Sequence, residues 1–171
     1  MDPLTHADKL QLEAAEGWLL LGDARQALAE LDQLRPEVQD HLAVLELRWN
    51  ASAQLADWTG AYNTAQRILE HWPDEVFGWI HRAFALRRMP GGGLERARDA
   101  LLPAADKFPE EFLVPYNLAC YEAVLGRLDT AWQWLTKAMR LAGRDRILKL
   151  ALADEDLVAL RDRLVRPEGK A

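Results

Sequence analysis

The sequence predicts an all-α protein made of paired helices that stack side by side. Apolar residues recur at steps of three or four on both sides of Gly126, so two helical patterns meet at one glycine. An alanine also recurs at spacings of 34, 36 and 34 residues, as Ala27, Ala61, Ala97 and Ala131. Because a single helical hairpin leaves an outer apolar face uncovered, a repeated hairpin is expected to stack against its copies.

The turn and breaker residues place the elements along the chain. Gly22 and Gly126 each allow one helix to end and its partner to begin, and Ala56-Asp57 stands at the equivalent place between them. The segment Met89–Gly93 is the clearest irregularity and lengthens one repeat by two residues. We expect helices over residues 8–21, 24–34, 38–55, 58–72, 75–89, 94–107, 116–125, 128–141, 144–152 and 154–165.

Several of these features recur in a fixed order. A small residue stands where paired helices would cross, a turn precedes it, and Pro73 and Pro109 each follow their alanine by twelve residues. In this order the sequence resembles the tetratricopeptide repeat (TPR) family, in particular its small bacterial-type domains, over about residues 8–142. Trp49 departs from the pattern, because the family prefers a small residue at its position, so we expect the second hairpin to pack differently.

The resemblance implies one domain over residues 1–171. It would be an α-solenoid of about four TPR-like helix-turn-helix repeats in a right-handed superhelix, at about 8–41, 42–75, 76–111 and 112–143. Stacked arrays need a terminal element with a polar outer face, and we expect capping helices over residues 144–166 to supply it. Asp154 is the expected N-cap of the second of these helices.

Composition excludes several classes of protein. The net charge of −6 and the pI near 5.2 argue against a nucleic-acid binder, which is normally basic. The acidity is concentrated in residues 1–57, where eleven acidic and four basic residues occur. No basic, apolar signal segment opens the chain, and no apolar run approaches the roughly 20 residues that span a bilayer. We therefore expect a cytoplasmic protein with no membrane partner.

No pattern of catalytic or metal-binding residues is convincing. Gly91-Gly92-Gly93 lacks both the preceding strand and the following Lys-Ser/Thr of a phosphate-binding loop. The four histidines are too far apart in sequence to form a preformed zinc site. Cys120 cannot form an internal disulfide, and within a helix we expect it to be a small packing residue. The sequence predicts a protein that is not an enzyme and has no cofactor or metal.

In the TPR family, partners are contacted mainly by the first helix of each repeat. Carried over by position, the first two repeats offer a partly acidic surface that includes Glu13, Glu16, Glu46 and Asn50. The candidate groove residues are Asn50, Phe77, Ile80, His81, Phe84, Arg87, Arg88, Leu113, Tyr116 and Asn117. We expect apolar anchoring by Phe77, Ile80, Phe84 and Tyr116, and backbone bonding by Asn50, His81 and Asn117.

The expected function is to bind a peptide or helix of another protein. The lysine and asparagine pattern with which some TPR proteins hold a C-terminal carboxylate is matched here only by Asn50, which disfavours that ligand. Two alternatives remain open: a structural subunit that uses the aromatic patch as a homodimer face, and a chaperone-like protein for a client polypeptide. The C-terminal helices are also a possible cover for the aromatic residues.

Overall fold

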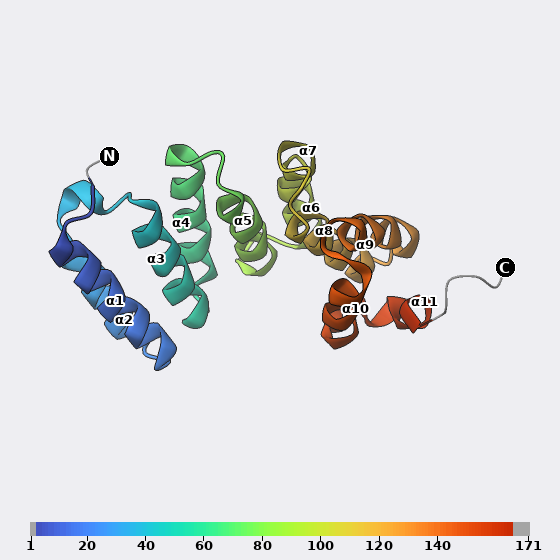
Figure 1. The fold of residues 1–171 in the computed structure, drawn as a ribbon, viewed down its shortest axis with the longest axis horizontal. Coiled ribbons are helices and arrows are strands. Elements are labelled where there is room, and N and C mark those ends of the chain that lie inside the picture. Colours follow the sequence, from blue (N-terminus) through green and yellow to red (C-terminus); the bar gives the residue numbers. More distant parts are fainter. Residues whose placement is uncertain (1–2, 166–171) are drawn as a thin grey trace. The chain divides into compact units, whose positions relative to one another are not determined.

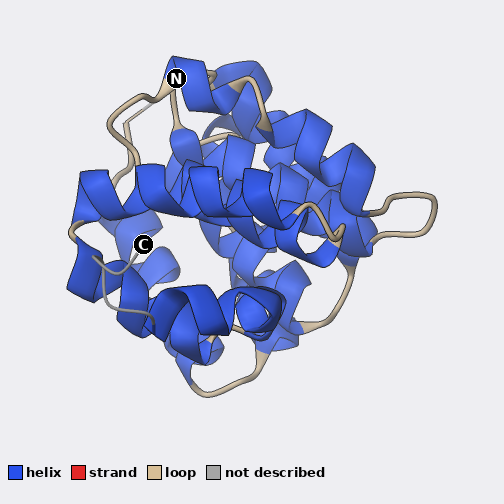
Figure 2. Ribbon diagram, turned by 90° about the vertical axis from the view of Figure 1, so that its right-hand side faces the viewer, coloured by secondary structure: helices blue, strands red, loops and turns tan. Residues whose placement is uncertain are grey.

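The computed structural model describes residues 3–165 and contains only helices and loops over that range (Figure 2). The all-α fold class is therefore confirmed. The chain divides into two compact units, Met1–Gly93 and Leu94–Ala171. In the described residues no helix is both long and apolar enough to cross a membrane.

The first unit consists of two helical hairpins and one further helix (Figure 1). Its elements are α1 (His6–Leu20), α2 (Ala24–Asp32), the 3-10 helix η1 (Pro36–Val38), α3 (Leu42–Gln54), α4 (Trp58–His71) and α5 (Val76–Arg88). Helix α1 packs on α2, α3 on α4, and α5 on α4, while α1 also contacts α3. The recurring alanines Ala27 and Ala61 are both fully buried, as their spacing predicts.

Side-chain caps fix where these helices begin. Thr5 and Asp8 form a reciprocal capping box at α1, and the Asp8 carboxylate also accepts a 3.1 Å hydrogen bond from Nε of Arg35. Both the Thr5 hydrogen bonds and Arg35 hold the pKa of Asp8 below its ordinary value. Asp23 and Asp57 cap α2 and α4 without such a box, each accepting a hydrogen bond from the backbone N–H three residues on.

The second unit contains one long hairpin between shorter helices. Its elements are α6 (Leu94–Leu101), α7 (Ala104–Lys107), α8 (Leu113–Val124), α9 (Leu128–Ala142), α10 (Arg144–Ala153), the 3-10 helix η2 (Glu155–Leu160) and α11 (Arg161–Val165). Helix α8 packs on α9 with Ala131 fully buried, and Gly126 turns between them at φ +78°. That left-handed conformation is easily reached by glycine.

Beyond shifts of up to three residues at helix ends, three expected elements differ from the structure. The helix expected over 94–107 is broken between α6 and α7, because Pro103 has no N–H to continue the ladder. The helix expected from residue 38 begins at Leu42, after η1. The helix expected over 154–165 is a 3-10 helix followed by α11, although Asp154 caps it as expected, accepting from the N–H of Asp156 at 3.0 Å. Position 166 of the expected cap lies outside the described residues.

The irregular segment Met89–Gly93 ends α5 with a tight reversal. The N–H groups of Gly92 and Gly93 bond to the carbonyls of Met89 and Leu86, each at 3.0 Å. A Cβ on Gly92 would lie 1.8 Å from the Leu86 carbonyl oxygen, so only glycine fits there. The structure thus supports a turn, and not a phosphate-binding loop, at these glycines.

Candidate partner-binding surface

Two neighbouring depressions lie on the first unit. One has a volume of about 540 Å³ and is lined by Glu16, Leu19, Leu20, Leu47, Trp49, Asn50, Ala53, Gln54, Trp58 and Phe84. The other has a volume of about 370 Å³ and is lined by Leu12, Glu13, Glu16, Ala43, Glu46, Leu47, Asn50 and Phe77. Because Glu16, Leu47 and Asn50 line both, the two depressions form one continuous surface, which we call the first-unit groove.

Helical periodicity explains why these side chains share one surface. On α3, Ala43, Leu47, Asn50 and Gln54 follow each other at steps of four, three and four residues. On α1, Leu12, Glu16 and Leu20 follow at steps of four. Residues so spaced lie on one face of a helix, and the groove is the place where the faces of α1, α3 and α5 meet.

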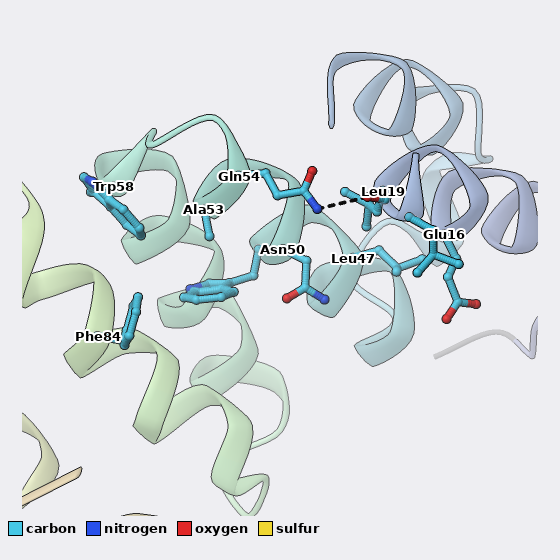
Figure 3. Close-up of a pocket in the computed structure, with 10 residues that line it drawn as sticks. Glu16, Leu19, Leu47, Asn50, Ala53, Gln54, Trp58 and Phe84 are labelled. Atoms are coloured by element: carbon cyan, nitrogen blue, oxygen red, sulfur yellow. Dashed lines mark hydrogen bonds between the residues drawn. The ribbon is translucent and has the colours of Figure 1, made fainter. Parts of the chain in front are cut away.

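A side chain joins the first helices of the two hairpins. Nε2 of Gln54 donates a hydrogen bond of 3.1 Å to the main-chain oxygen of Leu19 at the end of α1 (Figure 3). In the same view Trp58 and Phe84 lie on one side of Asn50, and Glu16 lies on the other. The groove therefore has an aromatic end and an acidic end.

The aromatic end is built around Trp49, the residue that departs from the family pattern. Its buried indole meets Phe77 and Phe84 edge to face, with ring centroids 5.9 Å apart in each case, and meets His81 at 4.2 Å. Phe84 also packs against Trp58 at 5.9 Å. The expectation of unusual packing in the second hairpin is met by this aromatic cluster, in which the large indole fills the space between α3 and α5.

His81 is held inside this cluster. Its ring stacks on Phe77 with centroids 3.6 Å apart, and its Nδ1 lies 2.9 Å from the Phe77 carbonyl oxygen. Burial lowers the pKa of His81 to about 4, outweighing the opposing effect of that hydrogen bond. The imidazole is therefore neutral at pH 7, with Nδ1–H donating to the carbonyl.

The acidic end carries Glu13 and Glu46, with Glu16 between the two ends. These are the only ionisable side chains among the described residues that line the groove. Burial raises the pKa of Glu46, and the nearby carboxylate of Glu75 raises it further. Negative charge is thus gathered here in a partly desolvated place.

The remaining groove candidates of the first unit have other surroundings. Asn50, Phe77 and Phe84 line the groove, whereas Ile80 is buried. The Arg88 guanidinium lies 3.5 Å from the centroid of Phe84 and donates a 3.0 Å hydrogen bond to that residue's carbonyl. Arg87 is half-buried.

The other candidates, Leu113, Tyr116 and Asn117, belong to α8 in the second unit. Tyr116 donates a hydrogen bond of 2.9 Å to Oδ2 of Asp154, and burial is the main reason that its pKa is raised. Asn117 turns its amide to the carbonyl of Leu113, 2.8 Å away, and Leu113 is exposed. In this unit the chain's own C-terminal segment occupies the place that a partner of Tyr116 would take.

Cys120 belongs to the same C-terminal contact. It is buried, and its Sγ lies 3.5 Å from Oδ2 of Asp154. Ligand atoms of Cys120, Asp154 and Asp156 lie within 4.8 Å of one another. Tyr116 and Cys120 both donate a hydrogen bond to the Asp154 carboxylate. The packing of η2 on α8 therefore explains why these side chains lie close together.

Sequence reasoning missed two contributors to the groove. Trp49 and Trp58 are not among the predicted groove residues, and both line the larger depression. Glu75 does not line either depression, but it stands at the start of α5 and raises the pKa of Glu46. Glu46 and Glu75 stand 29 residues apart in the sequence, so no local pattern indicates that their carboxylates lie close together.

The packed hairpins, with small residues at the helix crossings and positive-φ turns between their helices, define the class: this is an all-α protein with the TPR fold. Its structure is similar to the crystal structure of a thermophilic TPR protein of Thermus thermophilus, with a TM-score of 0.69. The similarity covers 92% of this chain and 89% of that chain, at 18% sequence identity. The sequence itself matches no family model and none of the curated proteins significantly.

Proposed function

We propose that the protein is a non-catalytic interaction module that holds a peptide or helix of another protein in the first-unit groove. The observation that carries this proposal is the groove itself: two joined depressions of about 540 and 370 Å³, with an apolar wall and polar groups at its centre. The fold supports the proposal, since TPR proteins generally serve as protein-interaction modules.

Anchoring would come from the apolar side chains. Leu20 is 84% exposed and Leu47, Trp58 and Phe84 are partly buried beside it. Such side chains lose little on binding because helices hold them in place, and they gain by excluding water. Asn50 is exposed at the junction of the two depressions, where its amide can both donate to and accept from a peptide backbone.

The same geometry makes the homodimer alternative less favourable. The rings of Phe77 and Phe84 already pack against Trp49, His81 and Trp58 within the unit. The aromatic patch that would form a dimer face is accordingly smaller than the sequence suggests. We expect the free protein to be monomeric at micromolar concentration, which sedimentation velocity measures directly.

A bulky, uncharged substitution that fills the groove tests the proposal. Asn50→Tyr places a large side chain at the junction without removing any core contact, and we expect it to abolish partner capture in affinity purification from native lysate. Asn63→Tyr is the matched control, because Asn63 is exposed on α4 and does not line the groove. Equal capture by both variants would refute the proposal, and a wild type that sediments as a dimer dispersed by Asn50→Tyr would favour the homodimer.

A further inference from the structure

The chemistry of the groove restricts the partner further, if the proposed function holds. The two depressions differ in charge: Trp49, Trp58 and Phe84 line only the larger one, while Glu13 and Glu46 line only the smaller one, together with the apolar Leu12, Ala43 and Phe77. Glu16 lies where the two meet. A partner must therefore satisfy an apolar site and an acidic site that adjoin each other.

The three carboxylates have no cationic partner in the described part of the chain. No ion pair within residues 3–165 involves Glu13, Glu16 or Glu46, whereas acids elsewhere, such as Asp8 and Asp32, are paired with arginines. Glu46 is only partly exposed and has a second carboxylate, Glu75, near it. Bringing a cation into this place would relieve the repulsion and pair charges that water screens incompletely.

A basic group stands at the opposite, aromatic end of the groove. The Arg88 guanidinium lies 3.5 Å from the centroid of the Phe84 ring and 5.3 Å from that of Trp58. A cationic side chain of a partner would be repelled there and attracted toward Glu13 and Glu46. Charge thus sets which part of a bound segment lies at which end.

We infer that the first-unit groove binds a basic, apolar segment of another protein, with a large apolar side chain at the Trp58–Phe84 end and lysine or arginine side chains at the Glu13–Glu46 end. This is charge complementarity of the kind that speeds encounter and selects partners. It is also the reverse of carboxylate recognition, for which a groove needs basic residues.

Selection from a random library of twelve-residue displayed peptides tests the inference. We expect selected peptides to place lysine or arginine next to large apolar residues. In fluorescence anisotropy, the triple variant Glu13→Gln/Glu16→Gln/Glu46→Gln should bind them at least tenfold more weakly. Raising the salt concentration from 0.05 to 0.5 M should weaken wild-type binding about as much and the triple variant's binding far less.

A second triple variant controls for the protein's overall acidity. Glu37→Gln/Glu70→Gln/Glu110→Gln removes the same charge from exposed or partly exposed positions outside the groove, and we expect its affinity to stay within about twofold of wild type. Equal weakening by both triple variants would overturn the inference, because general acidity would then account for the preference.

The two proposals fail in different ways. Selected peptides without basic residues, or peptides that bind the groove triple variant normally, would overturn the inference. If Asn50→Tyr still blocked those peptides, the groove function would stand. Peptides indifferent to Asn50→Tyr, or no enrichment at all, would overturn both the inference and the proposed function.

Discussion

Nε of Arg98 donates a hydrogen bond of 2.8 Å to Oε1 of Glu122, whose side chain is completely buried in the second unit. The other oxygen of Glu122 accepts from Arg127 at 3.4 Å, and Arg127 also pairs with Glu95. The carboxylate thereby links α6, α8 and the start of α9. The hydrogen bond to Asp99 and, to a smaller extent, the one to Glu122 raise the pKa of Arg98.

Removing the charge of Glu122 should weaken this unit. We expect Glu122→Gln to lower the free energy of unfolding by about 1–3 kcal/mol, because charged hydrogen bonds are the stronger ones and Arg98 would lose the buried one of its two counter-ions, keeping only the exposed Asp99. Hydrogen exchange of the α8 amides measures the effect in the second unit alone. The exposed Glu110→Gln is the control, and equal protection in both variants would contradict the prediction.

The turn between α3 and α4 should improve with glycine. Ala56 has φ +54°, the conformation that Gly22 and Gly126 adopt at +80° and +78° in their own turns. A left-handed alanine costs about 1–2 kcal/mol, so Ala56→Gly should stabilise the protein by about 1 kcal/mol in urea denaturation. Ala29→Gly, at an exposed position within α2, should instead destabilise it by about 0.5–1 kcal/mol. A loss of stability in both variants would show that Ala56 is not strained.

Acidification should weaken the first unit through His81. Its folded-state pKa is lowered from 6.5 to about 4, so the unfolded chain takes up a proton first as pH falls. The stabilisation is present above pH 6.5 and is lost progressively between 6.5 and 4, by up to about 3 kcal/mol. His81→Gln lacks this proton and should show a flatter dependence of stability on pH over that window. Titration of the His81 ring by NMR is the direct check, and a measured pKa near 6.5 would remove the basis of the prediction.

The C-terminal segment should be essential to the second unit. Leu160 is completely buried with Ala119, Cys120 and Ala123 in one apolar cluster, so Leu160→Ala should cost about 2–5 kcal/mol. Val158, two residues earlier in η2, is 50% exposed, and Val158→Ala should change little. Deleting residues 144–171 should cause loss of solubility, since α8 and α9 would present bare core surface. A soluble and equally stable truncation would show that the segment is an accessory.

The helical pairs within each unit could be predicted from the sequence because they depend on local periodicity. Ala27, Ala61, Ala97 and Ala131 are all fully buried. The turns at Gly22, Ala56 and Gly126 follow from the same repeat, because each residue stands at the equivalent position between the two helices of a hairpin, where the chain must reverse. The break at Pro103 is local too, and the missing N–H of proline was the available signal.

The side-chain contacts that define the site depended on tertiary structure. Tyr116 meets Asp154 across 38 residues, and Trp49 meets Phe77, His81 and Phe84 from another helix. The Glu75 carboxylate, from another helix, likewise raises the pKa of Glu46. The sequence by itself determined the helices and the buried alanine of each repeat, since the period of the α-helix is a property of the local chain, but it placed the buried Ile80 in the groove. Only the folded structure decided which side chains contact one another. Close packing brings together residues that are far apart in the sequence, and no regular spacing predicts which residues these are.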